Sequence, residues 1–586
     1  MGPRPLRLLF LGLDGADARI IRTLLAARRL PALAALARRG FLADLRSTIP
    51  AATLPAWATC LAGVNPGRHG VFDFARPDGY RLRFGSPRPA VPSWLESLAA
   101  AGLGVGAVGF PGRLHDENPL RFHVAGWDTP LDTAAGRGHV RPPELFERIR
   151  RELGRGALSF AAFDEYAAGA GGREDVLVGA LRGSSRLRAD LARFLCDAVP
   201  VDVLALHLQA LDTAGHHGWP RAGDGKRTAG RLREPAREPA APGDVVPWAI
   251  AATYEAVDEV VGGLVRDLCP QAVLIASDHG MGPTSDLVVS LNALLVAGGF
   301  QTPVPPSLLS RAALFGRRAA LRGLPDSFRR VAFRAAGAVV PGLAESLART
   351  AGIDLERTAA WSDELTYAPS VRLNVRGREP LGRIAPADRP RVAGKVAAFL
   401  RTARRPDGDP LFATVRLREE AFAGPHVESA PDVLLEPAED PEGRTPVLCP
   451  PHLHAALAGS WHMQVPAAER SGGKGGLLRG SHRPFGILLG DFPLALPDDG
   501  GRPAPPPLDL RDVAPLVHEL LDVPAPPWIE KPRRPARPEH VEGPAADSRP
   551  PAASAASPDA SDGLSPADRR ALAARLRALG YIEDDG

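Results

Sequence analysis

Three short apolar runs, each followed directly by an acidic side chain, constrain the fold of this chain more than any other feature. LLFLGL is followed by Asp14, VDVLALHLQAL by Asp212, and VLIAS by Asp278. Continuous apolar runs of this length are typical of strands buried on both faces of a parallel sheet. Between the last two runs, residues 250–264 carry apolar side chains at helical spacing. This alternation predicts an α/β fold, a doubly wound and mostly parallel sheet with helices on both faces.

The polar residues that follow these runs are expected to lie close together. In open α/β sheets ligands bind at the edge formed by the carboxyl ends of the strands, where Asp14, Asp212, Asp278 and His279 all fall. His216 follows Asp212 by four residues, across a predicted turn in LDTAGHHG. Three carboxylates and two imidazoles almost suffice to hold two divalent cations about 3.5–4 Å apart, with positions left for phosphate oxygens. The sequence therefore predicts a two-metal site that needs one more ligand.

The missing ligand is expected to be a histidine in a loop. His482, in GSHRPFGILLG, is the best candidate because it directly precedes a predicted strand. Three other histidines are weaker candidates: His452, His454 and His462. The first two lie in PHLHAALAG, which has a helical pattern. His207 and His217 are expected to be core residues or to support the ligands.

Thr53 is the candidate nucleophile. The run STIPAATLPAW places it where a helix should begin, with Pro55 in the first turn. The alternative is that Thr53 only caps this helix, which is a common role for threonine. A helix N-terminus also presents free N–H groups and positive dipole character, which suits a phosphoryl group attached to the hydroxyl. A bound metal would lower the pKa of that hydroxyl. Thr48 is a poorer candidate because it is expected to lie in the extended segment that leads into this helix.

Taken together, these motifs resemble the type I phosphodiesterase/nucleotide pyrophosphatase family of the alkaline phosphatase superfamily. The resemblance rests on Asp14, TLPAW, AGVNPGRHG, DTAGHHG, SDHGMG and GSHRPFG, and it covers residues 1–300 and 356–495. It implies an alkaline phosphatase-like core with two zinc ions, although aspartate and histidine ligands also accept manganese. It also implies a structural role for His69. The implied ligands are Asp212, His216 and His482 for one ion, and Asp14, Thr53, Asp278 and His279 for the other.

One position departs from the pattern of this family. Characterised nucleotide pyrophosphatases carry an asparagine three residues after the nucleophile, where this chain has Ala56. Loss of one neutral donor to a developing oxyanion costs on the order of 3 kcal/mol in transition-state stabilisation. Lys474, Arg479 or Arg483 could replace that donor. The departure argues against nucleotide substrates more than against phosphoester hydrolysis. The sulfatase branch is disfavoured, because its Cys-or-Ser-x-Pro-x-Arg signature is absent. The nucleophile position is Thr53, and Leu54-Pro55-Ala56 follow it.

The expected function is that of a two-metal phosphoesterase acting on a small phosphoester. A phosphodiesterase or pyrophosphatase-like enzyme with a phospho-threonine intermediate is favoured. The alternatives are a phosphomonoesterase, a phosphonate hydrolase or a phosphomutase of the same superfamily, and a non-catalytic metal-stabilised protein that binds anions. The sequence leaves the natural substrate, the preference for monoesters or diesters, and the oligomeric state open.

Composition changes along the chain suggest its organisation. Residues 1–300 are expected to form the first part of the core, 301–440 an inserted α+β cap region, and 441–500 the return to the core with the last ligand. Residues 501–562 are expected to be a linker and a disordered Pro/Ala-rich tail, followed by a C-terminal helix at 563–586. Within the cap, the arginine-rich stretch 311–349 is either a solvated face or an electropositive cover over the substrate site.

Charge and cysteine usage exclude several other classes of protein. The formal net charge is only +4, from 71 Lys and Arg against 67 Asp and Glu, so a nucleic-acid partner is not indicated. Four cysteines lie far apart in the sequence and are expected as reduced, packed thiols. No apolar run approaches the length of a membrane span, and the cytoplasm is the expected location.

Overall fold

The structure is a computed structural model of the 586-residue chain. It describes residues 6–73, 75–84, 88–112, 119–126, 134–158, 174–219, 246–304, 352–364, 369–449, 457, 459–465, 479–494 and 507–530. Several predicted features lie outside these residues: the basic stretch 311–349, His452, His454, Lys474 and the C-terminal helix 563–586.

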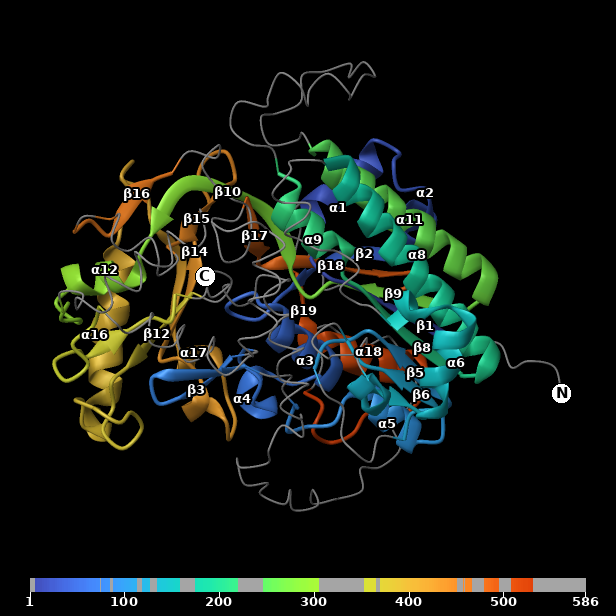
Figure 1. Cartoon of the computed structure of the whole chain (residues 1–586), viewed down its shortest axis with the longest axis horizontal. Coiled ribbons are helices and arrows are strands. Elements are labelled where there is room, and N and C mark those ends of the chain that lie inside the picture. The colour runs from blue at the N-terminus through green and yellow to red at the C-terminus, as the bar shows by residue number, and fades with distance from the viewer. Residues whose placement is uncertain are drawn as a thin grey trace.

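A nine-stranded sheet forms the larger part of the molecule (Figure 1), in the order β19-β2-β18-β9-β1-β8-β5-β6-β7. Its strands are β1 (Leu8–Leu13), β2 (Phe41–Arg46), β5 (Val105–Val108), β6 (Phe122–Val124), β7 (Val140–Arg141), β8 (Val203–Leu208), β9 (Ala272–Ala276), β18 (Phe485–Gly490) and β19 (Leu508–Asp509). Neighbouring strands run parallel, except that β18 is antiparallel to both of its neighbours and β7 is antiparallel to β6. The predicted doubly wound, mostly parallel sheet is confirmed.

Helices cover both faces of this sheet, as Figure 1 shows. On one side lie α1 (Ala18–Ala26), α2 (Pro31–Arg39), α8 (Glu174–Ala198), α9 (Ala210–His217) and α11 (Trp248–Leu268). On the other lie α3 (Thr53–Ala62), α5 (Trp94–Ala100) and α18 (Val513–Leu520). Shorter elements complete the larger part: α4 (Pro66–His69), α6 (Glu144–Glu152), and the 3-10 turns η1 (Ala134–His139), η2 (Arg155–Leu158) and η7 (Leu510–Asp512). The hairpin β3 (Ala75–Asp78) and β4 (Arg81–Phe84) reaches a second region of the molecule, where Tyr80 packs against Trp361 and donates a hydrogen bond to Asn374.

Strand β1 shows why its sequence is continuously apolar. Successive side chains of a strand point to opposite faces of the sheet. Leu9, Leu11 and Leu13 join the apolar cluster under α1 and α11, whereas Leu8 and Phe10 join the cluster under α3 and α18. Because both faces are covered, both sets of positions must be apolar.

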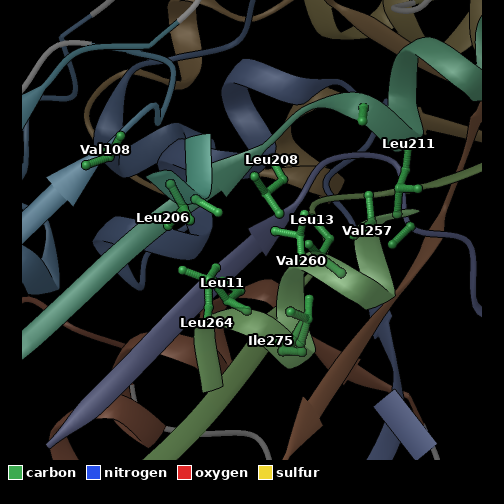
Figure 2. Packing of buried hydrophobic residues seen from close by; sticks show 14 of the residues in the cluster. Leu11, Leu13, Val108, Leu206, Leu208, Leu211, Val257, Val260, Leu264 and Ile275 are labelled. Carbon is green, nitrogen blue, oxygen red and sulfur yellow. The ribbon is translucent and has the colours of Figure 1, made fainter. Parts of the chain in front are cut away.

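Helix α11 closes one of these faces. Its Val257, Val260 and Leu264 pack toward Leu11 and Leu13 of β1, as Figure 2 shows. Their spacing of three to four residues puts them on one side of the helix. This packing fixes the central strands whose ends carry the reactive side chains.

A smaller part of the molecule is built around the long strand β10 (Gly280–Val289), which runs away from the large sheet in Figure 1. With β10, the strands β15 (Thr445–Leu448), β16 (His462–Gln464) and β17 (Gly480–Arg483) form a four-stranded sheet. A second sheet has the order β11-β12-β14-β13, from β11 (Ala360–Trp361), β12 (Ser370–Leu373), β14 (Val433–Pro437) and β13 (Phe412–Leu417). Its helices are α12 (Leu291–Ala297), α16 (Arg389–Thr402) and α17 (Arg418–Ala421), with 3-10 turns η3 (Pro386–Asp388) and η4 (Val427–Ser429).

Two expectations need correction. Residues 507–530 fall in the stretch expected to be a linker, yet β19 pairs with β2, and Val513, Leu516 and Val517 of α18 are buried in the core. The apolar face of this short helix outweighs the proline-rich composition around it.

The four cysteines are free, as expected, but Cys269 is exposed rather than packed. Among the helices described, none is long and apolar enough to span a membrane.

Candidate metal centre

The candidate ligands lie at the carboxyl ends of the three adjacent central strands. Asp14 directly follows β1, and Asp278 and His279 follow β9 on one side of it. On the other side, β8 leads into α9, which carries Asp212 and His216. All five side chains are almost completely buried. The structure therefore brings together five residues from three separate stretches of the sequence.

Asp14, Asp278 and His279 form the first group of ligand atoms, which lie within 4.8 Å of one another. The Nε2 atom of His279 is 3.3 Å from Asp278 Oδ2 and 3.6 Å from Asp14 Oδ1. The Nδ1 atom of the same ring lies 3.1 Å from the carbonyl oxygen of Gly280. Because a carbonyl only accepts, Nδ1 carries the proton and Nε2 presents its lone pair to the two carboxylates.

Asp212, His216 and His482 form the second group, also within 4.8 Å. His216 Nδ1 donates to the carbonyl oxygen of Gly480 at 2.9 Å, and His482 Nδ1 donates to that of Ala51 at 2.8 Å. Both Nε2 atoms therefore carry lone pairs. They lie 3.1 Å from each other, and 3.1 and 3.3 Å from Asp212 Oδ1. In neutral rings these two lone pairs face each other beside the Asp212 carboxylate, an arrangement that fits a bound cation.

The local structure around these ligands differs from the sequence prediction. Asp212 and His216 were expected across a turn, but both lie on α9, where a spacing of four residues places them on one face. His482 was expected in a loop and lies instead in β17, paired with Met281 of β10. Gly280, directly after His279, begins β10. In each case pairing or packing with a distant segment outweighs the local glycine signal.

The two groups are in direct contact. The rings of His279 and His482 stack with their centroids 3.8 Å apart and their planes 19° apart. The antiparallel pairing of β10 with β17 makes this contact, because it brings His482 beside the strand that starts directly after His279. Two ions held by these groups would share one site.

Thr53 is the first residue of α3, and its hydroxyl faces the first group. Its Oγ1 lies 3.2 Å from Nε2 of His279, and the residue is only 3% exposed. The helix cap is Ala52, which makes no side-chain capping bond. Thr53 is therefore not the capping residue that the alternative interpretation required. Its hydroxyl lies beside the ligand atoms.

The electrostatics of the first group suit a bound cation. Burial raises the pKa of Asp278 well above its ordinary value, and the neighbouring Asp14 raises it further. Burial, together with the nearby His482, lowers the pKa of His279 to about 3. Asp14 Oδ1 and Asp278 Oδ2 are buried and accept no hydrogen bond within the described part of the chain. Buried carboxylates need a compensating charge, and oxygen and imidazole donors in this number fit two divalent cations.

Gly15 and Gly215 allow the close packing around the site. Gly15 has a φ of +72°, and its N–H donates to Asp278 Oδ1 at 3.2 Å. A Cβ atom on Gly15 would lie 2.8 Å from the backbone of Asp212, and one on Gly215 would lie 2.7 Å from the side chain of Met281. Larger residues at either position would push the ligand-bearing segments apart.

Several other sequence candidates lie in supporting positions. His207 Nε2 is 3.1 Å from Asp14 Oδ2, so this histidine contacts a candidate ligand. His69 contacts the Thr59 hydroxyl at 2.9 Å and accepts from the N–H of Val71 at 3.1 Å, a role within the α3–α4 corner. His217 is buried beside His216 on α9, and His462 lies in β16, outside both groups.

Of the proposed replacements for the asparagine donor, the two that the structure describes, Arg479 and Arg483, are directed elsewhere. Arg479 donates to the carbonyl oxygens of His217 and Trp219. Arg483 donates to that of Gly443, and it points to the opposite face of β17 from His482. Ala56 is completely buried in the apolar cluster under α3. Because this position faces the core, an asparagine here would not be aimed at a phosphate.

Comparison with known proteins identifies a family. A family model described as type I phosphodiesterase / nucleotide pyrophosphatase matches residues 8–442. Similar solved structures include phosphonoacetate hydrolase from Sinorhizobium meliloti 1021 in complex with phosphonoformate, at 14% identity and a TM-score of 0.45, covering 87% of this chain and 94% of that chain. Human ectonucleotide pyrophosphatase / phosphodiesterase 5 matches at 12% identity and a TM-score of 0.41, covering 89% and 96%. No curated protein sequence matched significantly.

Proposed function

The chain belongs to the type I phosphodiesterase/nucleotide pyrophosphatase family, and from this membership we propose that it hydrolyses a small phosphodiester through a covalent intermediate on Thr53. The family makes it a metal-dependent hydrolase of phosphoester bonds in the alkaline phosphatase superfamily. The finer proposal concerns two metal ions, the nucleophile and the preference for diesters.

Two sets of side chains would hold the metal ions. Asp212, His216 and His482 would bind one ion, and Asp14, Asp278 and His279 the other, with Thr53 beside the second. When bound, two divalent ions of this kind lower the pKa of a coordinated hydroxyl or water and neutralise charge on phosphoryl oxygens. Zinc is the favoured metal, and manganese suits the same donors.

Thr53 would act as the nucleophile. Its oxygen attacks phosphorus in line with the leaving alkoxide, so that a Thr53–phosphorus bond forms as the bond to the leaving oxygen breaks. The hydroxyl proton passes to solvent, and the leaving alkoxide takes one from solvent. Water then attacks the phosphorylated Thr53, releases a phosphomonoester and restores the hydroxyl. The start of α3 supports this role, because its free N–H groups can donate to phosphoryl oxygens.

The observation that carries the proposal is the 3.2 Å contact between Thr53 Oγ1 and Nε2 of His279. A threonine that merely capped α3 would turn its hydroxyl back to the helix. This hydroxyl faces a ligand atom instead, which is the arrangement that a metal-activated nucleophile needs.

Thr53→Ala tests the proposal against Thr53→Ser as the matched control. In metal-loaded enzyme, Thr53→Ala should lower the rate on bis(4-nitrophenyl) phosphate by at least about 10³-fold, whereas Thr53→Ser keeps measurable turnover. Both variants should retain the metal content of the parent. Rapid quenching followed by peptide mass spectrometry should find the adduct on the peptide that contains Thr53. Full activity of Thr53→Ala would remove the covalent mechanism.

A substrate panel tests the preference for diesters. Rates on bis(4-nitrophenyl) phosphate should exceed those on 4-nitrophenyl phosphate and on phosphonoacetate. A higher rate on the monoester or on the phosphonate would reassign the enzyme to another branch of the superfamily. No turnover of any compound by protein that holds metal stoichiometrically would favour the anion-binding alternative.

A further inference from the structure

His207 makes a specific contact with one of the candidate ligands. Its Nε2 lies 3.1 Å from Asp14 Oδ2, and the two side chains are 2% and 0% exposed. An ionised carboxylate only accepts hydrogen bonds, so Nε2 carries the proton and donates it. The other oxygen of Asp14, Oδ1, is the one that faces His279. The hydrogen bond thus distinguishes the two oxygens of this carboxylate.

Aromatic side chains hold the ring of His207 in place. Trp57 meets it edge-on, with centroids 5.2 Å apart and planes at 86°, and Phe110 lies 5.4 Å from it. Trp57 and Phe110 also contact each other at 5.2 Å. A ring enclosed in this way cannot turn its Nε2 away from Asp14 without displacing a fully buried tryptophan.

Gly12 makes room for this arrangement. It is the β1 residue in register with His207 of β8, so the two positions share one face of the sheet. A Cβ atom on Gly12 would lie 2.7 Å from Trp57 and 2.8 Å from Phe110. The strand that ends in Asp14 therefore lacks a side chain at the point where the aromatic rings approach His207.

We propose that His207 is a positioning residue that holds Asp14 so that Oδ1 alone is presented to the ion of the first group. This inference rests on the proposed function, because it assumes that Asp14 binds metal. A carboxylate ligand without such a hydrogen bond can bind an ion through either oxygen and from more than one rotamer. Fixing one of these arrangements lowers the conformational entropy that is lost when the ion binds. Asp14 binds metal less tightly when the donor is removed, even where the packing is kept.

Two substitutions separate the hydrogen bond from the packing. His207→Phe keeps a ring between Trp57 and Phe110 but has no N–H. His207→Gln has a smaller side chain but keeps an N–H donor near the position of Nε2. As a control, His518→Phe removes another buried histidine, whose Nε2 bonds the Ser97 hydroxyl at 2.9 Å on the α5–α18 side of the sheet.

The measurement is the affinity of each purified full-length variant for Zn²⁺, determined by competition with a chromophoric chelator, together with the number of ions bound. We expect the parent to bind two ions. His207→Phe should weaken one of them by about 10–100-fold and leave the other unchanged. His207→Gln should recover most of that loss, and His518→Phe should bind both ions as the parent does.

The outcomes separate two failures. If the parent binds two ions and His207→Phe binds both as tightly, His207 only packs and the inference is wrong, while the proposed function stands. The same holds if the Phe and Gln variants are equally weakened, because the effect would then follow packing rather than the donor. If the parent binds no ion, the proposed function fails and the positioning role falls with it.

Discussion

Two buried aspartates of this chain differ in how their charge is compensated. Asp432, in the smaller part of the molecule, is completely buried and contacts three guanidinium groups: Arg378 at 2.7 Å, Arg389 at 3.0 Å and Arg418 at 3.7 Å. Asp278, at the edge of the large sheet, is equally buried, and its Oδ2 lies 3.3 Å from the neutral imidazole of His279. Burial raises the pKa of both carboxyls, but the arginines reverse this for Asp432 and lower its pKa, whereas Asp14 raises the pKa of Asp278 further.

The difference indicates what each place is built for. Where the chain needs a buried carboxylate for structure, it supplies arginines. Among the described residues, the carboxyl edge of the large sheet supplies further carboxylates and imidazoles instead, a set of donors that fits bound cations. The two aspartates should therefore respond to the same substitution in different ways.

The largest expected effect is on activity. Asp278→Asn removes a charged ligand and should lower the rate on bis(4-nitrophenyl) phosphate by about 10³-fold, since metal ions contribute several kcal/mol to transition-state stabilisation. Asp432→Asn should keep the rate within a few-fold of the parent at a temperature where it is folded. Steady-state rates on metal-loaded variants check both. Equal losses in the two variants would break the comparison.

The next effect is on stability. Asp432→Asn removes the buried charge that three arginines share and should lower the free energy of unfolding by about 3–5 kcal/mol at pH 7. Urea unfolding followed by circular dichroism measures this. Arg391→Gln is a suitable control, because its ion pair with Asp388 is exposed and should contribute less than about 1 kcal/mol. A loss of under 1 kcal/mol in Asp432→Asn would show that the arginine network is not stabilising.

The pH dependence of that loss sharpens the comparison. A carboxyl whose pKa is lowered by folding contributes stability above its unfolded value of about 3.9, and this contribution is lost as the pH falls through the folded value. The difference between the parent and Asp432→Asn should therefore be constant at neutral pH and shrink below about pH 4. Unfolding curves at several pH values would show it, and a difference that grows toward low pH would contradict the assigned direction.

The smallest effect has the opposite sign. In metal-free protein the raised pKa of Asp278 means that its ionised form opposes folding, and this cost increases as the pH rises through the folded value. At pH 7, Asp278→Asn should therefore stabilise the metal-free protein, whereas Asp432→Asn destabilises it. Thermal unfolding after chelation measures both. A destabilised, metal-free Asp278→Asn would imply that the protein itself compensates this carboxylate.

The sequence predicted the parts of this site that depend on strands. The strands β1, β8 and β9 could be predicted from the sequence, because both of their faces are buried and their positions are therefore almost continuously apolar. Their carboxyl ends then had to meet at one edge of the sheet. The place of Thr53 at the start of α3 could be predicted from the proline in the first turn, although the orientation of its hydroxyl toward His279 could not.

The parts of the site that depend on contacts between distant segments could not be predicted from the sequence. β17 is four residues long with the sequence GSHR, which has no apolar alternation, and it is a strand because β10 pairs with it. Helix α9 contains Gly215, a residue typical of turns, and the glycine is required there because Met281 packs against the helix. The hydrogen bond of His207 to Asp14 depends on the register of β1 with β8, which no local pattern reports.

The most direct test of this account is the number of divalent ions per chain, measured by elemental analysis after exhaustive dialysis of the parent, His482→Ala, Asp278→Ala and the double variant. The account predicts two ions in the parent, one in each single variant and none in the double variant. A folded parent that retains no ion, or ions that neither substitution removes, would contradict it.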